Sequence, residues 1–216
     1  MILVWILLLL FASMLPAQSN STSNKELWNW YFWEALDTGK FRIRGVAQFR
    51  SQPHVPAFLR SQGGPILEWQ ATKRWNLIAG YYFQEFRGSS RDPEMKGAHR
   101  PFGGVEYGRS VGKVGFETRH LFEYFKALAT ADSARGRARV RFEFPLKRTL
   151  FLQNEVFYDQ LGVQANRTES GLVFNINKTL QFQPSVFYEG RPQRTGGSRL
   201  VFNTRITVFG PLNKTR

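Results

Sequence analysis

Charged residues occupy every second position of one short segment, and they are the residues of this chain best placed to do chemistry. Arg135, Arg137, Arg139, Arg141 and Glu143 alternate with small or apolar residues in the segment ARGRARVRFEF. Successive side chains of an extended strand point to opposite faces, so the segment predicts a strand with one charged and one apolar face. Like charges about 7 Å apart along a strand repel each other, so carboxylates from neighbouring strands or water must offset them.

The same alternation recurs along most of the chain and predicts a ladder of charged side chains on one face of a sheet. Glu117, Glu123 and Glu155 are the expected counter-charges for the arginines at 135–141. Val46 and Phe187 break the pattern, because they are apolar residues in the charged phase. The predicted ladder consists of Arg42, Arg44, Arg100, Glu106, Glu117, Arg119, Glu123, Arg135, Arg137, Arg139, Arg141, Glu143, Glu155, Arg167, Glu169 and Arg205.

About eleven strand-like runs follow residue 24, and no convincing helix does. Most runs are close to eleven residues long, which is about what a tilted strand needs to cross a bilayer. Alternation of short turns with long loops is typical of outer-membrane barrels. The sequence predicts short connections at 37–39, 73–75, 111–113, 145–148 and 177–178, and longer ones at 51–63, 87–98, 125–133, 159–166 and 190–198.

These features predict an all-β fold, an antiparallel up-and-down transmembrane β-barrel of 10–12 strands. Twelve is the favoured number, because single-chain bacterial barrels normally have an even number of strands. The apolar face of each strand would then meet lipid, and the charged face would line a wet interior. The expected barrel covers residues 25–210, with a short tail at 211–216.

The first residues predict export. The apolar run Ile2–Leu15 is short for a transmembrane helix and is followed by small residues, so residues 1–17 are expected to be a signal peptide. An uncleaved anchor is the alternative, and residues 18–24 are expected to be a flexible polar segment. Because an exported protein rarely meets nucleic acid, the net charge of +14 points instead to a basic interior or to anionic lipid.

Aromatic residues near strand ends suit the girdles that outer-membrane barrels carry at both membrane interfaces, with ordinary sheet packing as the alternative. The candidates are Trp28, Trp30, Trp33, Trp69, Trp75, Tyr81, Tyr82 and Tyr188.

Support for catalysis is weak. The chain has no cysteine, no pair of histidines at metal-ligand spacing, no Gly-x-Ser-x-Gly motif and no phosphate-binding loop motif, so neither a metal nor a cofactor is expected. His120 shares a phase with Phe116 and Phe122, which places it on the apolar face and not among the charged residues.

Three blocks of the sequence resemble a known family. They are the segment ELWNWYFWEAL with the following GKFRIRGVAQFR, the pair VGFETRHLFEYF and RGRARVRFEFPL, and LFLQNEVFYD followed by RTESGLVFNI. Over the whole mature chain this pattern resembles the uncharacterised bacterial outer-membrane family catalogued as domain of unknown function 2490. The resemblance implies an outer-membrane β-barrel of unknown activity and supplies no catalytic residues.

The sequence therefore predicts a bacterial outer-membrane β-barrel with an Arg/Glu-lined interior. It would be either a structural protein with a filled interior or a pore for small solutes that favours anions. An outer-membrane enzyme acting on lipid or lipopolysaccharide and a soluble exported β-barrel that binds a ligand are the alternatives. The expected partners are outer-membrane lipid, lipopolysaccharide and the barrel-assembly machinery; nucleic acid is not among them, and a monomer is expected.

Overall fold

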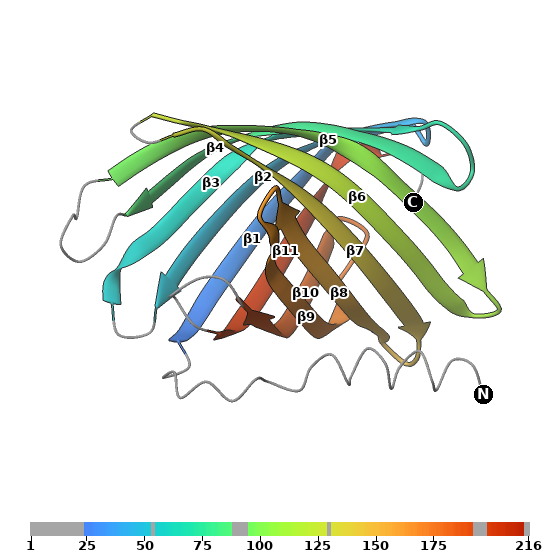
Figure 1. The fold of residues 1–216 in the computed structure, drawn as a ribbon. Coiled ribbons are helices and arrows are strands. Elements are labelled where there is room, and N and C mark those ends of the chain that lie inside the picture. The colour runs from blue at the N-terminus through green and yellow to red at the C-terminus, as the bar shows by residue number, and fades with distance from the viewer. Residues whose placement is uncertain (1–23, 53–54, 88–94, 129–130, 192–197, 214–216) are drawn as a thin grey trace.

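A computed structural model describes residues 24–52, 55–87, 95–128, 131–191 and 198–213 of the chain. All the regular elements of this part are strands, which form one closed barrel (Figure 1). They are β1 (Asn24–Asp37), β2 (Phe41–Gln52), β3 (Val55–Gln70), β4 (Trp75–Arg87), β5 (Met95–Val111), β6 (Val114–Ala127), β7 (Ser133–Pro145), β8 (Thr149–Asp159), β9 (Gly162–Asn175), β10 (Leu180–Gly190) and β11 (Arg199–Asn213). The predicted signal peptide at 1–17 lies outside the described residues.

The barrel closes where β1 meets β11, and these two strands run parallel. Each of the other neighbouring pairs follows the chain order and is antiparallel. The all-β barrel is confirmed, but the preference for twelve strands and the wholly antiparallel arrangement were wrong. An odd number of strands brings the first and last strands together in the same direction, and the register from Asn24↔Arg199 to Asp37↔Asn213 seals that seam.

The two ends of the barrel differ less in their connections than the sequence predicts. The connections after β1, β3, β5, β7 and β9 lie at one end, here called the turn end, and each has two to four residues. At the opposite end, called the loop end, the chain reverses after β2, β4, β6, β8 and β10. Two of the long loops predicted at this end, 51–63 and 159–166, were wrong in extent.

Local chemistry explains both differences. β3 starts at Val55, within the segment predicted as a loop, and its pairing with β2 shifts register beside Arg50 and Ser51, as at a β-bulge. Between β8 and β9 the amide of Leu161 donates to Asp159 Oδ1 at 2.8 Å, and Gly162 adopts a φ of 104°. The side-chain acceptor and the left-handed glycine make a tight turn where a loop was predicted.

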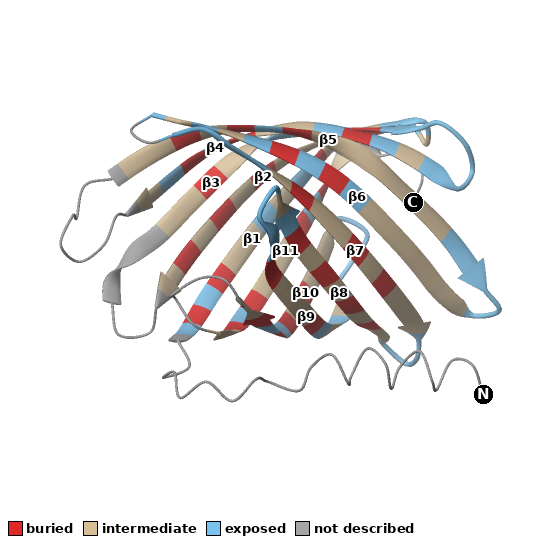
Figure 2. Cartoon of the chain, viewed as in Figure 1, coloured by how far each residue is buried: buried red, intermediate tan, exposed pale blue. Residues whose placement is uncertain are grey.

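Side-chain burial is reversed relative to a water-soluble fold. Buried residues alternate with more exposed ones along the strands (Figure 2). On β2, Arg50 and Gln48 are buried, whereas the large apolar side chains of Phe41 and Ile43 are exposed on the outside. The interior is therefore mainly polar and charged, and the outer surface is mainly apolar.

Candidate functional site

Eight side chains of alternating charge form a chain of ion pairs around the interior, here called the ion-pair belt. Eight neighbouring strands, β5 to β11 and then β1, contribute one residue each. The belt consists of Arg100, Glu123, Arg137, Glu155, Arg167, Glu189, Arg199 and Glu26.

Distances within the belt are those of direct ion pairs. Arg137 donates from Nη1 to Glu123 and from Nη2 to Glu155, at 2.7 Å each. Arg167 Nη1 lies 3.3 Å from Glu155 and its Nη2 lies 2.7 Å from Glu189. Arg199 Nη2 lies 2.6 Å from the carboxylate of Glu189, and Arg199 is the last residue of the belt before the seam.

Sheet register produces the belt. Glu155 is directly opposite Arg167 on β9, Arg167 is opposite Glu189 on β10, and Glu189 is opposite Arg199 on β11. Side chains directly opposite in a ladder lie about 5 Å apart at Cβ, so opposite charges meet there. A one-residue slip of any of these strands would turn its charge to the outer surface.

The ion-pair belt continues across the seam from Arg199 to Glu26. Arg199 Nη1 donates to both carboxylate oxygens of Glu26, at 2.8 and 2.9 Å. Oε2 of Glu26 also accepts a hydrogen bond from the indole Nε1 of Trp28, at 2.7 Å. Arg50, on the next strand, makes a cation–π contact with Trp28: its guanidinium lies 3.6 Å from the centre of the ring.

Further ion pairs lie between the belt and the turn end. Arg139 pairs with Glu117, and Arg141 Nη2 lies 2.7 Å from Glu143. On the opposite side of the barrel Arg42 lies 3.0 Å from Glu68 and 3.1 Å from Asp37. Arg44 also pairs with Glu68.

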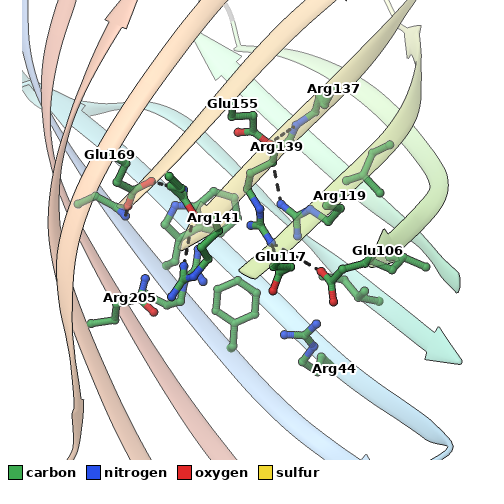
Figure 3. Close-up of a pocket in the computed structure, with 18 of the residues that line it drawn as sticks. Arg44, Glu106, Glu117, Arg119, Arg137, Arg139, Arg141, Glu155, Glu169 and Arg205 are labelled. Carbon is green, nitrogen blue, oxygen red and sulfur yellow. Dashed lines mark hydrogen bonds and ion pairs between the residues drawn. The ribbon is translucent and has the colours of Figure 1, made fainter. Parts of the chain in front are cut away.

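The described residues line an inner cavity and a mouth cavity inside the barrel. The inner cavity has a volume of about 280 Å³ and extends from the belt toward the turn end. Figure 3 shows side chains that line it, including Arg44, Glu117 and Arg205. The mouth cavity, of about 130 Å³, extends from the belt toward the loop end. Both contact Trp28, Trp30, Arg137 and Arg167, so they adjoin each other at the belt.

Positive charge exceeds negative charge in both cavities. Eight arginines and six glutamates line the inner cavity, and eight arginines and one glutamate line the mouth cavity. Within the described part of the chain, Arg50 and Arg60 in the mouth cavity and Arg205 in the inner cavity make no ion pair with a carboxylate. The residues that line the two cavities therefore carry a net positive charge.

The inner cavity also has an apolar side, here called the apolar wall. It is a cluster of buried side chains from β2 to β6, against which Trp30 and Phe32 of β1 pack. Tyr82 and Phe102 have their ring centres 4.7 Å apart, and the Phe102 ring fills the space that a side chain at Gly80 would need. The apolar wall consists of Val46, Ile66, Ile78, Tyr82, Phe102 and Leu121.

The structure places the predicted ladder residues in the interior. Arg100 and Arg135 line the mouth cavity, and Glu123 is buried between them and Arg137. The others line the inner cavity: Arg42, Arg44, Glu106, Glu117, Arg119, Arg137, Arg139, Arg141, Glu143, Glu155, Arg167, Glu169 and Arg205.

Sequence reasoning missed several interior charges. Most of them lie at strand ends or in segments expected to be loops, where alternation could not be followed. Two of them carried a usable signal: Arg50 continues the phase of Arg42 and Arg44, and Glu189 shares the polar phase of its strand with Gln181, Gln183 and Ser185. The missed residues are Glu26, Glu34, Asp37, Arg50, Arg60, Glu68, Glu189, Arg191 and Arg199.

The aromatic girdle prediction was partly wrong. Trp28 and Tyr82 are buried inside the barrel, and Trp30 lines both cavities. On β1 the even-numbered positions face inward before the irregularity near residue 35, so Trp28 and Trp30 share a phase with Glu26. Trp33, Trp69 and Trp75 are exposed, as are Tyr188 and, on the outer face, the His120 side chain.

Two classes of feature are lacking among the described residues. No helix there is long and apolar enough to cross a membrane. In the same residues, no group of three or more His, Cys, Asp or Glu side chains is placed to hold a metal ion.

Comparison with known proteins gives one match. The profile of a family described as "Protein of unknown function (DUF2490)" matches residues 25–199, which is most of the chain. This confirms the family resemblance drawn from the sequence, while the family's description says nothing about a membrane. No curated protein and no solved structure matches.

Proposed function

We propose that the chain, which belongs to the DUF2490 family of proteins of unknown function, is an outer-membrane β-barrel whose interior admits small anions in preference to cations. The observation that carries the proposal is the reversed burial: an apolar outer surface around an interior of ion pairs with an excess of arginine. Lipid would cover the outside, and water and anions would occupy the cavities.

The outer surface supports the lipid-facing part of this proposal. Large apolar side chains such as Leu67, Leu77, Phe122 and Phe202 are exposed there. In water such a surface would promote aggregation, and soluble monomers rarely expose contiguous apolar patches of more than a few hundred Å². Contact of the same surface with the hydrocarbon of a bilayer would be favourable.

Polar groups on the outer face satisfy one another, as lipid would require. Asn154 Nδ2 donates to Asn166 Oδ1 at 2.7 Å and to Thr168 Oγ1 at 2.9 Å. Across the seam, Thr204 Oγ1 donates to Asn29 Oδ1 at 2.6 Å. An unpaired amide in hydrocarbon costs several kcal/mol, whereas bulk water would supply partners without these contacts.

The anion preference follows from the arginines that lack a carboxylate partner. Arg50, Arg60 and Arg205 carry charge into the cavities that no glutamate of the described residues neutralises at ion-pair distance. An anion entering either cavity offsets this charge, whereas a cation adds to it.

Planar-bilayer recording on refolded protein tests this function. Under a tenfold KCl gradient, we expect a reversal potential of the sign that chloride permeation produces. Arg60→Gln combined with Arg205→Gln should shift that potential toward zero. The matched control, Arg109→Gln, removes an exposed arginine and should leave it unchanged. A cation-selective current would overturn the anion preference.

A structural role is the second candidate, and the ion-pair belt favours it. Eight side chains paired from strand to strand occupy interior space at one level of the barrel, and the interiors of small barrels are commonly filled by side chains. If correctly folded protein in a bilayer gives no current, the belt is a brace and the barrel is closed.

A further inference from the structure

The inner cavity has two sides of opposite character, and a path for inorganic ions alone does not need both. We propose that it binds a small organic anion with an apolar body, such as an aromatic or short-chain carboxylate. This inference rests on the proposed function, because it names the class of solute for the same interior.

Arg205 supplies the first half of the argument. It lines the inner cavity, its Nε is buried without a hydrogen-bond partner, and no carboxylate of the described residues pairs with it. Arg119 is similar: its Nε also has no partner, and its nearest carboxylate oxygen, on Glu155, lies 3.9 Å away. Buried guanidinium nitrogens that lack hydrogen-bond partners are costly, and a ligand carboxylate can satisfy them with charge-assisted hydrogen bonds.

Phe32 connects the two sides of the cavity. Its ring centre lies 5.1 Å from the Arg205 guanidinium and 5.9 Å from that of Arg44, and it stacks on Trp30 at 5.8 Å. A ligand whose charged group reaches Arg205 would therefore place its body beside an aromatic surface.

The apolar wall supplies the second half. Ile66, Ile78, Phe102 and Leu121 line the same cavity as the arginines. A hydrated inorganic anion gains nothing from such a surface, whereas an apolar body leaves water there, at roughly 25 cal/mol per Å² of area buried. The combination selects for an amphiphile, not for chloride or phosphate.

Size limits the candidates further. A cavity of about 280 Å³ is near the lower end of the range for small-molecule sites, roughly 300–1,000 Å³. One ring or a short alkyl chain fits this volume, but an intact phospholipid or lipid A does not. A neutral ligand would leave the guanidinium groups unpaired, and an organic cation would meet an excess of arginine.

Isothermal titration of protein in lipid nanodiscs tests the proposal, with empty nanodiscs as the blank. The probes are benzoate, acetate, benzyl alcohol and benzylamine. We expect saturable binding of benzoate at least about tenfold tighter than that of any of the other three, because each lacks one of the two contacts. Equal affinity for benzoate and acetate, or for benzoate and benzyl alcohol, would overturn the inference.

Variants of each side locate the site. Arg205→Gln should weaken benzoate about tenfold, the range of a lost charge-assisted hydrogen bond, and Arg205→Lys should restore part of the affinity. Leu121→Ser should lower benzoate affinity toward that of acetate. Arg109→Gln is the matched control and should change nothing. Heat-modifiable gel mobility verifies that every variant is folded.

The outcomes separate this inference from the proposed function. An anion-selective current with no benzoate binding overturns the inference alone. Benzoate binding that depends on Arg205, in a barrel that passes no current, supports the inference and overturns the pore. Benzoate binding that Arg205→Gln leaves unchanged places the ligand elsewhere and also overturns the inference.

Discussion

The two sides of the barrel interior carry different kinds of side chain. From β6 through β11 to β1, opposite charges meet at nearly every strand, and Glu123 and Glu189 are almost fully buried among arginines. From β2 to β6 the middle of the interior carries the apolar wall. The charged side favours one strand register, because a one-residue slip would turn its charges to the outer surface, whereas the apolar side borders the inner cavity.

Among single substitutions on the two sides, Glu123→Gln on the charged side is expected to lower the free energy of unfolding most. This carboxylate contacts Arg100, Arg135 and Arg137, so Glu123→Gln leaves buried positive charges without compensation. We expect a loss of about 3–5 kcal/mol in the free energy of unfolding, measured by urea titration of the barrel in detergent micelles.

Glu143→Gln is the matched control for that loss. Its side chain is 44% exposed and, among the described residues, forms an ion pair with Arg141 only, so the expected cost is below about 1 kcal/mol. Equal losses at Glu123 and Glu143 would show that the belt does not brace the barrel.

A charge on the outer face tests which side of the strands meets lipid. Val140 lies between the inward-facing Arg139 and Arg141 and pairs in register with Thr118 and Asn154. Val140→Arg should cost roughly 2–4 kcal/mol near the midplane and block assembly into membranes. Heat-modifiable mobility of membrane fractions measures assembly, with Val140→Leu as the control. Normal insertion of the arginine variant would contradict the assignment of faces.

A smaller effect is expected on the apolar wall. Phe102→Leu removes part of a ring that borders an open cavity and leaves no charge unpaired. The free energy of unfolding should fall by less than about 1.5 kcal/mol in the same urea titration. A loss as large as that of Glu123→Gln would mean that the apolar wall, not the belt, holds the interior together.

The smallest energetic effect is expected at the seam that completes the charged side. Asn29 and Thr204 are directly opposite across β1 and β11, and the chain has no cysteine of its own. Cysteines at both positions should form a disulfide under mild oxidation, without loss of heat-modifiable mobility. Cysteines at Asn29 and Val208, about 13 Å apart along the strands, should not. Failure of the first pair would argue against closure by parallel strands.

Sequence patterns predicted the charged side better than the apolar side. Arg135 to Arg141 alternate so strictly that their common face follows from strand geometry. Val46 and Phe187 looked like exceptions to this alternation, yet both point inward, where Val46 belongs to the apolar wall and Phe187 packs on Trp28. A two-residue period tells which face a residue shares, but not that part of a polar interior is apolar.

Long-range partners explain what else the sequence could not provide. Glu26 and Arg199 are far apart in the chain and meet because the barrel closes with β1 beside β11. The sequence shows about eleven strand-like runs, and twelve strands were favoured only because single-chain bacterial barrels normally have an even number. The interior of the barrel could be predicted from alternation, whereas its closure could not.

The position of tryptophans relative to lipid tests the central claim most directly. Trp69 is 45% exposed on the outer face and Trp28 is 1% exposed inside the barrel. Two variants, each keeping one of these as the only tryptophan, would be reconstituted in bilayers of lipid brominated along its acyl chains. A lipid-facing outer surface predicts strong quenching of Trp69 fluorescence and little quenching of Trp28. Equal quenching of the two, or no quenching of Trp69, would contradict it.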